Sequence, residues 1–230
     1  MNRTVVYHPR LNERGQKVVL ATPSNEANLA QLADADASAT FAPTSRWEQA
    51  LHGVLLASWS PSDPGASIWE ELATSQINEP AYVAPVGMRA AAGAVVVEPD
   101  GRVWMVAPSN GFGGYQVTFP KGRVETGASM QATAIKEVWE ESGLLVKLTG
   151  YLGDFVRTQT YTRFYVAHRV GGSPCDMGWE SQAVHLAPVA KAYTLLNRST
   201  DRDVLKAFEA FTARATPESG VEGGVHGSPA

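Results

Sequence analysis

The sequence has only one cysteine, Cys175, among its 230 residues. A single cysteine excludes a disulfide within the chain and any zinc site that is built mainly from cysteine thiolates. Few cysteines are typical of proteins from a reducing compartment, and we therefore expect a cytoplasmic location. The first residues, MNRTVVYHPR, contain no apolar run like that of a secretory signal, so we expect none there.

Long hydrophobic runs and an excess of positive charge are also missing. The most apolar stretch, residues 83–97, is interrupted by Arg89 and is shorter than the ~20 residues that cross a bilayer, so we expect no membrane partner. Lys and Arg number 19 against 23 Asp and Glu, for a net charge of -4. This balance leaves no basic surface for duplex nucleic acid. An anionic substrate would need local positive charge or a metal ion.

The chain does have enough apolar residues, 44% of the total, to bury a sizeable core. A cluster of Pro80, Pro85 and Gly87 marks a domain boundary. We therefore expect an N-terminal extension or small domain over residues 1–85 and the main domain over residues 86–214. Residues 215–230 are rich in Gly, Pro, Ser and Glu, and we expect a disordered tail.

Hydrophobic periodicity predicts that the pattern of secondary structure changes near residue 89. Before it, we expect short helices in an α+β arrangement, at residues 25–35, 46–59 and 67–77, although a strand could end the second. After it, the pattern predicts a hairpin around Asp100–Gly101 and a helix that Gly143 ends. The remaining expected elements are strands at 144–156, 162–170 and 183–188 and helices at 189–196 and 202–214.

Three acidic residues gather on the predicted helix in the segment FPKGRVETGASMQATAIKEVWEESGLLV, residues 119–146. At about 100° per residue, Glu137 and Glu141 lie about 40° apart and Glu140 about 60° to their other side. Ile135, Val138 and Ser142 would then face the sheet. Three acids on a helix are, by themselves, more often a solvated face than a metal site. Because like charges at this spacing repel, however, nearby cations or a metal would have to offset them, and Mg²⁺ prefers such oxygen ligands.

The loop before the helix favours the metal, because together they resemble the box of the Nudix hydrolase family, G-x5-E-x7-R-E-U-x-E-E-x-G-U, where U is a bulky apolar residue. The spacing is kept from Gly122 to Leu144, but Ala128 replaces the first Glu and Lys136 replaces the Arg. The resemblance implies an α/β/α sandwich with a mixed sheet over roughly residues 88–212, preceded by the α+β extension.

The resemblance also implies roles for the acids. Glu137 and Glu141 would bind Mg²⁺, or Mn²⁺ as a substitute, with the backbone carbonyl of Lys121. Glu140 would be a further ligand or the base that orients the attacking water. Nudix enzymes often add a carboxylate from outside the box, and Glu180 is our candidate, with Asp176 in reserve. A surface-loop acid is an equally good interpretation of Glu180.

Positive side chains near the box are candidates for phosphate binding. Lys121 and Arg123 flank Gly122, and both residue types suit phosphate. This Pro-Lys-Gly form looks like that of Nudix members acting on diadenosine polyphosphates or diphosphoinositol polyphosphates, but a surface Lys and Arg beside acids would look the same. Arg157 and Arg163 could add charge from the following strands, although exposed strand residues are the more frequent case.

Three hypotheses follow. The first is a Mg²⁺-dependent Nudix hydrolase that cleaves the diphosphate linkage of a nucleoside diphosphate joined to another moiety, such as a dinucleoside polyphosphate or an ADP-ribose-like compound. The second is a catalytically weak nucleotide sensor, suggested by Ala128. In the family, the first Glu and the Arg are thought to brace the loop and helix, so we expect a shifted scaffold here rather than a dead site. The third is a homodimer formed through residues 1–85, whose Trp- and Leu-bearing segments need a partner surface.

Overall fold

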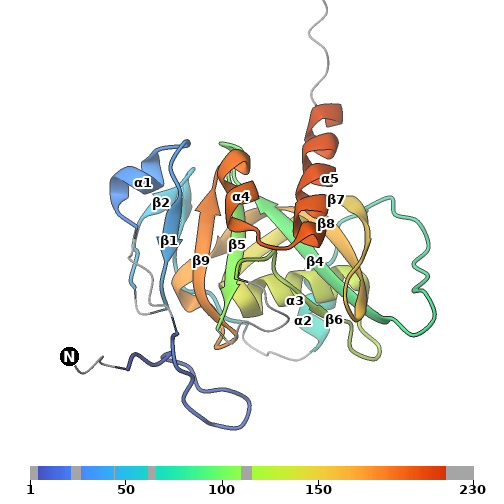
Figure 1. The fold of residues 1–230 in the computed structure, drawn as a ribbon, viewed down its shortest axis with the longest axis horizontal. Coiled ribbons are helices and arrows are strands. Elements are labelled where there is room, and N and C mark those ends of the chain that lie inside the picture. Colours follow the sequence, from blue (N-terminus) through green and yellow to red (C-terminus); the bar gives the residue numbers. More distant parts are fainter. Residues whose placement is uncertain (1–4, 22–26, 44, 62–65, 110–115, 216–230) are drawn as a thin grey trace, which may run out of the picture.

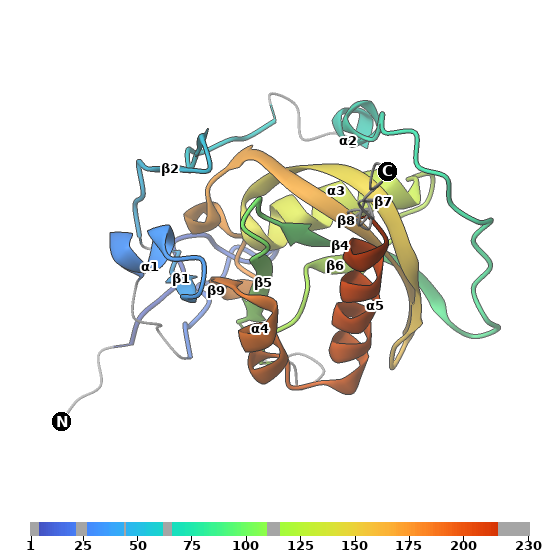
Figure 2. The ribbon, with the colours of Figure 1, turned by 90° about the horizontal axis from the view of Figure 1, so that it is seen from above.

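The fold is a mixed β-sheet between two layers of helices (Figures 1 and 2). The computed structural model describes residues 5–21, 27–43, 45–61, 66–109 and 116–215. Helices α2 (Ala66–Leu72) and α3 (Met130–Ser142) lie on one side of the sheet, and α4 (Val189–Leu195) and α5 (Ser199–Ala215) lie on the other. Each face of the sheet carries its own buried apolar cluster. The sandwich predicted from the sequence is confirmed.

Within the described residues, the sheet has seven strands in the order β1-β9-β5-β4-β8-β7, with β6 paired to β4. β4 and β8 run parallel, and the other neighbours are antiparallel. A nearly continuous apolar sequence suits β4 for the centre, because helices cover both faces there. The strands are β1 (Ala39–Phe41), β4 (Arg89–Val97), β5 (Val103–Pro108), β6 (Lys121–Arg123), β7 (Leu144–Val156), β8 (Thr160–Gly172) and β9 (Ser181–Ala187).

The short strand β6 reaches its place because Gly93 of β4 has no side chain. A Cβ atom at Gly93 would lie 2.4 Å from the carbonyl oxygen of Pro120 and 2.5 Å from Cβ of Lys121. The backbone of β6 therefore runs close beside β4 as its antiparallel partner, and Gly93 pairs with Lys121. This close approach fixes the loop that faces the acidic helix.

Helix α3 has well-defined ends. The Ser129 side chain accepts a hydrogen bond from the Ala132 N–H at the N-terminus, and Gly143 ends the helix with φ 72°. The residues predicted to face the sheet, Ile135, Val138 and Ser142, are all buried. The local sequence thus sets both the length of the helix and its rotation, and the three glutamates remain on its other side.

The helix predicted at residues 46–59 is wrong, because this segment forms a hairpin. Strands β2 (Ala50–Leu51) and β3 (Val54–Leu55) pair antiparallel around His52 and Gly53. Both turn residues have positive φ, 50° and 79°, as a two-residue hairpin turn requires. The other two early helices are confirmed in shorter form, as α1 (Leu29–Ala33) and α2.

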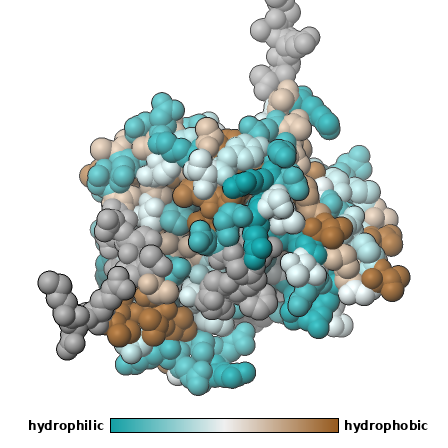
Figure 3. Space-filling view, viewed as in Figure 1, coloured by the Kyte–Doolittle hydropathy of each residue, from teal (hydrophilic) through white to brown (hydrophobic). Residues whose placement is uncertain are grey.

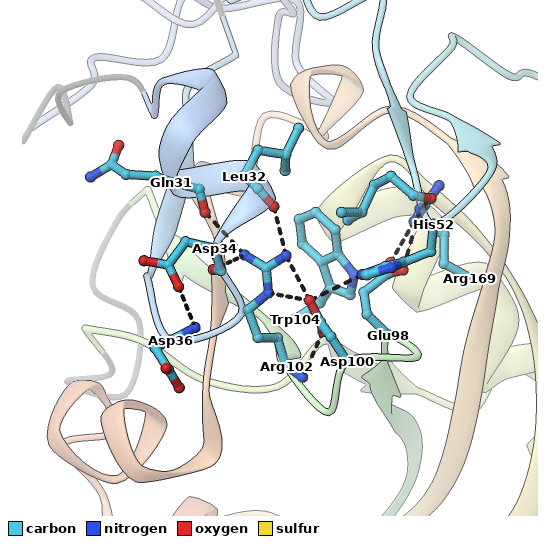
Figure 4. Close-up of polar contacts among 11 residues, drawn as sticks. Gln31, Leu32, Asp34, Asp36, His52, Glu98, Asp100, Arg102, Trp104 and Arg169 are labelled. Atoms are coloured by element: carbon cyan, nitrogen blue, oxygen red, sulfur yellow. Dashed lines mark hydrogen bonds and ion pairs between the residues drawn. The ribbon is translucent and has the colours of Figure 1, made fainter.

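A buried arginine holds α1 against the sheet (Figure 4). The Arg102 guanidinium donates to the backbone carbonyls of Gln31, Leu32 and Asp34 at 2.7–3.1 Å. Its charge is balanced by Asp100, at 2.7 Å. Because a guanidinium carries five donors in one plane, a single side chain satisfies several carbonyls at the C-terminal end of α1.

A second buried arginine, Arg169 of β8, holds the β2–β3 hairpin in the same way. It donates to the carbonyl of Leu51 at 2.9 Å and forms an ion pair with Glu98 at 2.6 Å. Glu98 also accepts from the Trp104 indole at 2.8 Å. Together with the pairing of β1 and β9, these contacts attach residues 27–61 to the sheet of the C-terminal part.

The molecular surface in Figure 3 is largely hydrophilic, with hydrophobic surface over the N-terminal segment at the lower left. Val5, Leu11 and Val19 of that segment are about half exposed. No helix in the described part of the chain is long and apolar enough to cross a membrane. The predicted tail, apart from Ala215, lies outside the described residues.

Candidate active site

The three glutamates of α3 lie against the backbone of β6. The Glu141 carboxylate accepts a hydrogen bond from the Lys121 N–H at 2.9 Å. The Glu137 carboxylate lies so close to Gly122 that a Cβ atom there would be 2.1 Å from both of its oxygens. Any other residue at position 122 would displace that carboxylate. The glycine that opens the box is therefore required by packing against the site itself.

Like charges and burial strongly disfavour ionisation of these acids. Burial first, and then the charges of Glu141 and Glu140, raise the pKa of Glu137 to about 9. Burial raises the pKa of Glu141 to about 7, although the charge and the backbone N–H of Lys121 act in the opposite direction. Burial also raises the pKa of Glu140, against the effect of Lys136. The charges of Lys121 and Lys136 offset only part of this effect.

Glu180 lies close to this cluster, just before β9. Its charge contributes to the raised pKa values of Glu137, Glu140 and Glu141. Its own pKa is raised by burial and then by the charge of Glu13, a residue that the sequence analysis did not single out. No sequence motif could have identified Glu13, because it comes from a turn far away in the chain. Five acids from three segments thus influence one another.

The two basic residues that flank Gly122 differ in their surroundings. The Lys121 ammonium donates to the Phe119 carbonyl at 3.4 Å and favours ionisation of Glu141. Arg123 is exposed and lines a small cavity of ≈ 130 Å³ with Lys136 and Ala128. Both lie beside the acidic helix, as the box spacing requires. Their contact with a phosphate stays a prediction.

Arg157 and Arg163 are not gathered with these residues. Arg157 is buried in an ion pair of 2.5 Å with Asp201 of α5. Arg163 is buried too, and both ends of its guanidinium bond to Asp154, at 2.7 and 2.8 Å. It also donates to the Pro80 carbonyl at 2.9 Å, so it holds the chain that precedes β4. Each of these arginines is bound to a carboxylate elsewhere in the fold.

Lys136, one of the two departures from the box, forms ion pairs with acids on either side of it. The Lys136 ammonium lies 2.6 Å from Glu125 and 3.7 Å from Glu140. Glu125 stands three residues before Ala128, in the same loop, so an acid is still available to the lysine. The sequence analysis did not identify Glu125. An acid close to position 128 in the sequence was the feature that could have indicated a partner for Lys136. The shifted scaffold that we expected stays a prediction.

The part of the chain that precedes β4 also packs on the outer side of α3, through α2 and Trp59. The Glu70 carboxylate of α2 accepts from the Ser129 N–H at 2.8 Å, at the start of the helix. The rings of Trp59, Trp69 and Trp139 pack in edge-on and tilted pairs with centroids 5.3–6.2 Å apart. The Trp139 indole donates to the Trp59 carbonyl at 3.2 Å. The apolar side chains that suggested a dimer thus find partners within the chain.

The donors at this site fit a hard divalent cation, although the carboxylates are not drawn together around a common point. Among the described residues, no three His, Cys, Asp or Glu side chains converge enough to hold a metal ion as they stand. All of the candidate donors are oxygens, and they carry negative charge that nothing in the described chain fully balances. A cation would relieve the repulsion that raises their pKa values.

Solved structures resemble this fold at low similarity. A Nudix hydrolase from Nitrosomonas europaea is 17% identical with a TM-score of 0.49, over 58% of this chain and 76% of that one. An Ap4A hydrolase from C. elegans is 18% identical with a TM-score of 0.45, over 55% and 99% of the two chains. An ADP-ribose pyrophosphatase from Streptococcus suis is 16% identical with a TM-score of 0.46, over 56% and 93%. Similarity this low carries no argument about the substrate.

No curated protein matches the sequence. The profile of the family described as NUDIX domain, in contrast, matches residues 87–208, which is more than half of the chain and includes β6 and α3. The chain therefore belongs to the Nudix family and is a Nudix-type pyrophosphohydrolase.

Proposed function

We propose that the protein hydrolyses, with Mg²⁺, the diphosphate linkage of a nucleoside diphosphate joined to another moiety. The observation that supports this most is the cluster of Glu137, Glu140 and Glu141, whose pKa values are raised and whose carboxylates lie against β6. A cluster without balancing charge costs stability, and such a cost is typical of a site that serves a ligand. A polyphosphate–Mg²⁺ complex is a ligand of the right charge distribution.

In this proposal Glu137 and Glu141 hold the metal with the Lys121 carbonyl, and Glu140 and Glu180 are the candidates for orienting water. When bound, the cation neutralises phosphate oxygens and lowers the pKa of a coordinated water. Lys121 and Arg123 would bind the phosphates that flank the cleaved bond. Arg157, which the sequence placed among the substrate contacts, is engaged by Asp201, so we assign the phosphate contacts to the first two residues.

The test is a hydrolysis screen with Mg²⁺ or Mn²⁺ against dinucleoside polyphosphates, ADP-ribose, NADH and diphosphoinositol polyphosphates. Glu141→Gln should lower kcat by about 100-fold or more, the effect expected for a group at the reacting centre. Glu71→Gln, at an exposed position of α2, is the matched control and should keep the wild-type rate. A folded Glu141→Gln protein with full activity would contradict the proposal.

The sensor hypothesis is separated from the hydrolase by the same screen, because a sensor would bind a nucleotide without turnover. The contact between Lys136 and Glu125 supplies an acid to the loop that Ala128 lacks, and we therefore favour the hydrolase. A cytoplasmic location and a homodimer stay predictions. Sedimentation of the purified chain would test the second of these directly.

A further inference from the structure

A second cleft, of ≈ 840 Å³, lies between the N-terminal segment and the short 3₁₀ helix η2 (Pro174–Asp176). On one side it is lined by Arg10, Arg46 and Trp47 of the N-terminal segment, and on the other by Asp176 and Met177. The cleft is large enough for a nucleotide-sized ligand. Most of its lining residues precede the matched family domain.

Two polar side chains in the wall of this cleft have no hydrogen-bond partner in the described structure. Ser45 is 7% exposed, and its hydroxyl makes no hydrogen bond. One carboxylate oxygen of Asp176 is buried and equally unsatisfied. Buried polar atoms in folded proteins almost always have a partner, so each exception needs an explanation. A polar ligand in the cleft would supply the missing contacts, for example a sugar hydroxyl to the carboxylate.

The two arginines of the cleft also differ from the other arginines that join the N-terminal segment to the domain. Arg102, Arg163 and Arg169 are buried and paired with carboxylates. Arg10 and Arg46 are exposed, and neither forms an ion pair with any residue that the structure describes. Two guanidinium groups at one cleft suit a phosphate.

An aromatic residue completes the set. Trp47 lines the cleft and is only half-buried, and it packs edge-on against Phe41 with ring centroids 5.4 Å apart. A partly exposed indole that is held by a neighbouring ring offers a flat, rigid surface on which a base can stack. Phosphate-binding cations beside a stacking ring indicate a nucleotide rather than a simple polyphosphate.

The backbone that follows the cleft residues contacts the backbone of α3, which carries the acidic site. The Gly178 N–H donates to the Glu140 carbonyl at 2.7 Å, immediately after the cleft residues Asp176 and Met177. On the other wall, Arg10 precedes the turn that carries Glu13, whose charge acts on Glu180. Both walls of the cleft therefore lead to residues of the acidic cluster.

We propose that this cleft binds the nucleoside monophosphate part of the substrate while the diphosphate linkage lies at the acidic helix. This inference rests on the proposed function. It assigns Arg10 and Arg46 to the nucleotide phosphate and Trp47 to the base. The N-terminal segment then determines which substrates bind, whereas α3 performs the chemistry.

Binding alone is the first test. Isothermal titration of the full-length protein with AMP, GMP, CMP and UMP is done in a chelator, so that no metal ion bridges the phosphate to the acidic site. At least one nucleotide should bind, and Arg10→Ala and Arg46→Ala should each weaken its Kd about tenfold, which corresponds to about one charge-assisted hydrogen bond. Arg14→Ala, on the same N-terminal turn but outside the cleft lining, should bind within twofold of the wild type.

The inference is overturned if none of the four nucleotides binds at millimolar concentration, or if the cleft variants bind as the wild type does. Thermal unfolding of each variant checks that it remains folded, and both arginines are at exposed positions. A Trp47→Phe variant, which keeps an aromatic ring, should bind more tightly than Trp47→Ala. Equal binding by the two would remove the assignment of the base to this ring.

Kinetics then separate this inference from the proposed function. With any substrate that the wild type hydrolyses, Arg10→Ala and Arg46→Ala should raise KM about tenfold and keep kcat within twofold. An unchanged KM would overturn the inference and leave the hydrolase intact. If the wild type hydrolyses nothing in the screen but binds nucleotide through the arginines, the proposed function fails and the nucleotide site stands.

Discussion

Charge is arranged in opposite ways in two regions of this molecule. Where the N-terminal segment joins the sheet, Arg102, Arg163 and Arg169 each meet a carboxylate and one or more backbone carbonyls. On α3, three carboxylates lie together, and burial and mutual repulsion raise the pKa values of Glu137 and Glu141 to about 9 and about 7. The first region is balanced within the chain, and the second is not.

The difference separates charges that maintain the fold from charges that serve a ligand. A buried charge that is paired and hydrogen-bonded holds segments in register, and its removal exposes the partner to an apolar surrounding. A cluster of like charges weakens the fold until something from outside neutralises it. The four predictions below test this division at single residues, beginning with the largest effect.

Breaking a balanced pair should have the largest cost. Arg169→Met leaves Glu98, which is 3% exposed, without its cation and frees the carbonyls of the β2–β3 hairpin. We expect the free energy of unfolding to fall by about 3–5 kcal/mol, measured by urea denaturation. Adding Glu98→Gln should recover part of the loss, because an amide oxygen still accepts from Trp104. A loss below about 1 kcal/mol in the single variant would mean that the junction does not depend on this pair.

The neutral His185 side chain, where β1 joins β9, predicts how the stability of this junction depends on acidic pH. Burial lowers the pKa of His185 to about 4, and its ring lies 2.9 Å from the Thr40 hydroxyl across the β1–β9 pair. The unfolded chain takes up this proton below about pH 6.5 and the folded chain only near pH 4, so stability is lost as the pH falls through that window. The loss should approach about 3 kcal/mol.

Denaturation curves between pH 7 and pH 4 measure this effect. His185→Gln should flatten the dependence, whereas His168→Gln, at an exposed position of β8, should behave like the wild type. Equal slopes for all three proteins would show that His185 does not carry the acid sensitivity of the junction.

Replacing one ionisable acid of the unbalanced region should change stability in the opposite direction. The pKa of Glu137 is raised, so the folded chain holds a proton that the unfolded chain releases, and stability falls as the pH rises from about 4.5 to about 9. Without metal at pH 8, Glu137→Gln should therefore be more stable than the wild type by at least about 2 kcal/mol. Added Mg²⁺ should stabilise the wild type and narrow the difference. If the variant were less stable than the wild type, the Glu137 carboxylate would instead stabilise the fold, as the paired charges do.

The sequence predicted the unbalanced region better than the balanced one, and the reason is distance along the chain. The three glutamates belong to one helix that Gly143 ends, so spacing alone places them on one side of it. Arg163, in contrast, was weighed as a substrate contact because its partners Asp154 and Pro80 could not be identified from its own neighbourhood. Arg157 pairs with Asp201, 44 residues away. Local periodicity contains no information about such pairs.

The misread hairpin has a similar cause. Leu51, Val54 and Leu55 are apolar at spacings that fit a helix as well as a strand ending, and the apolar pattern does not decide between them. The deciding feature is the His52–Gly53 pair, both at positive φ, which a helical reading treats as two ordinary positions. The hairpin is then fixed by Arg169, from a strand more than a hundred residues later.

The one balanced member of the acidic helix gives the smallest and most specific prediction. Lys136 is paired with Glu125, whose side chain is 70% exposed, and an exposed pair contributes little because solvent screens it. Glu125→Gln should thus cost about 0.5 kcal/mol or less.

Ala128→Glu places an acid at the position where the family box has one, in a cavity that Lys136 also lines. In the Glu125→Gln background it should restore the lost stability, and thermal unfolding of the four proteins of this cycle measures the coupling. Two strictly additive changes would show that positions 125 and 128 do not share the lysine, and that the loop is held by α2 through Glu70 and Ser129 instead.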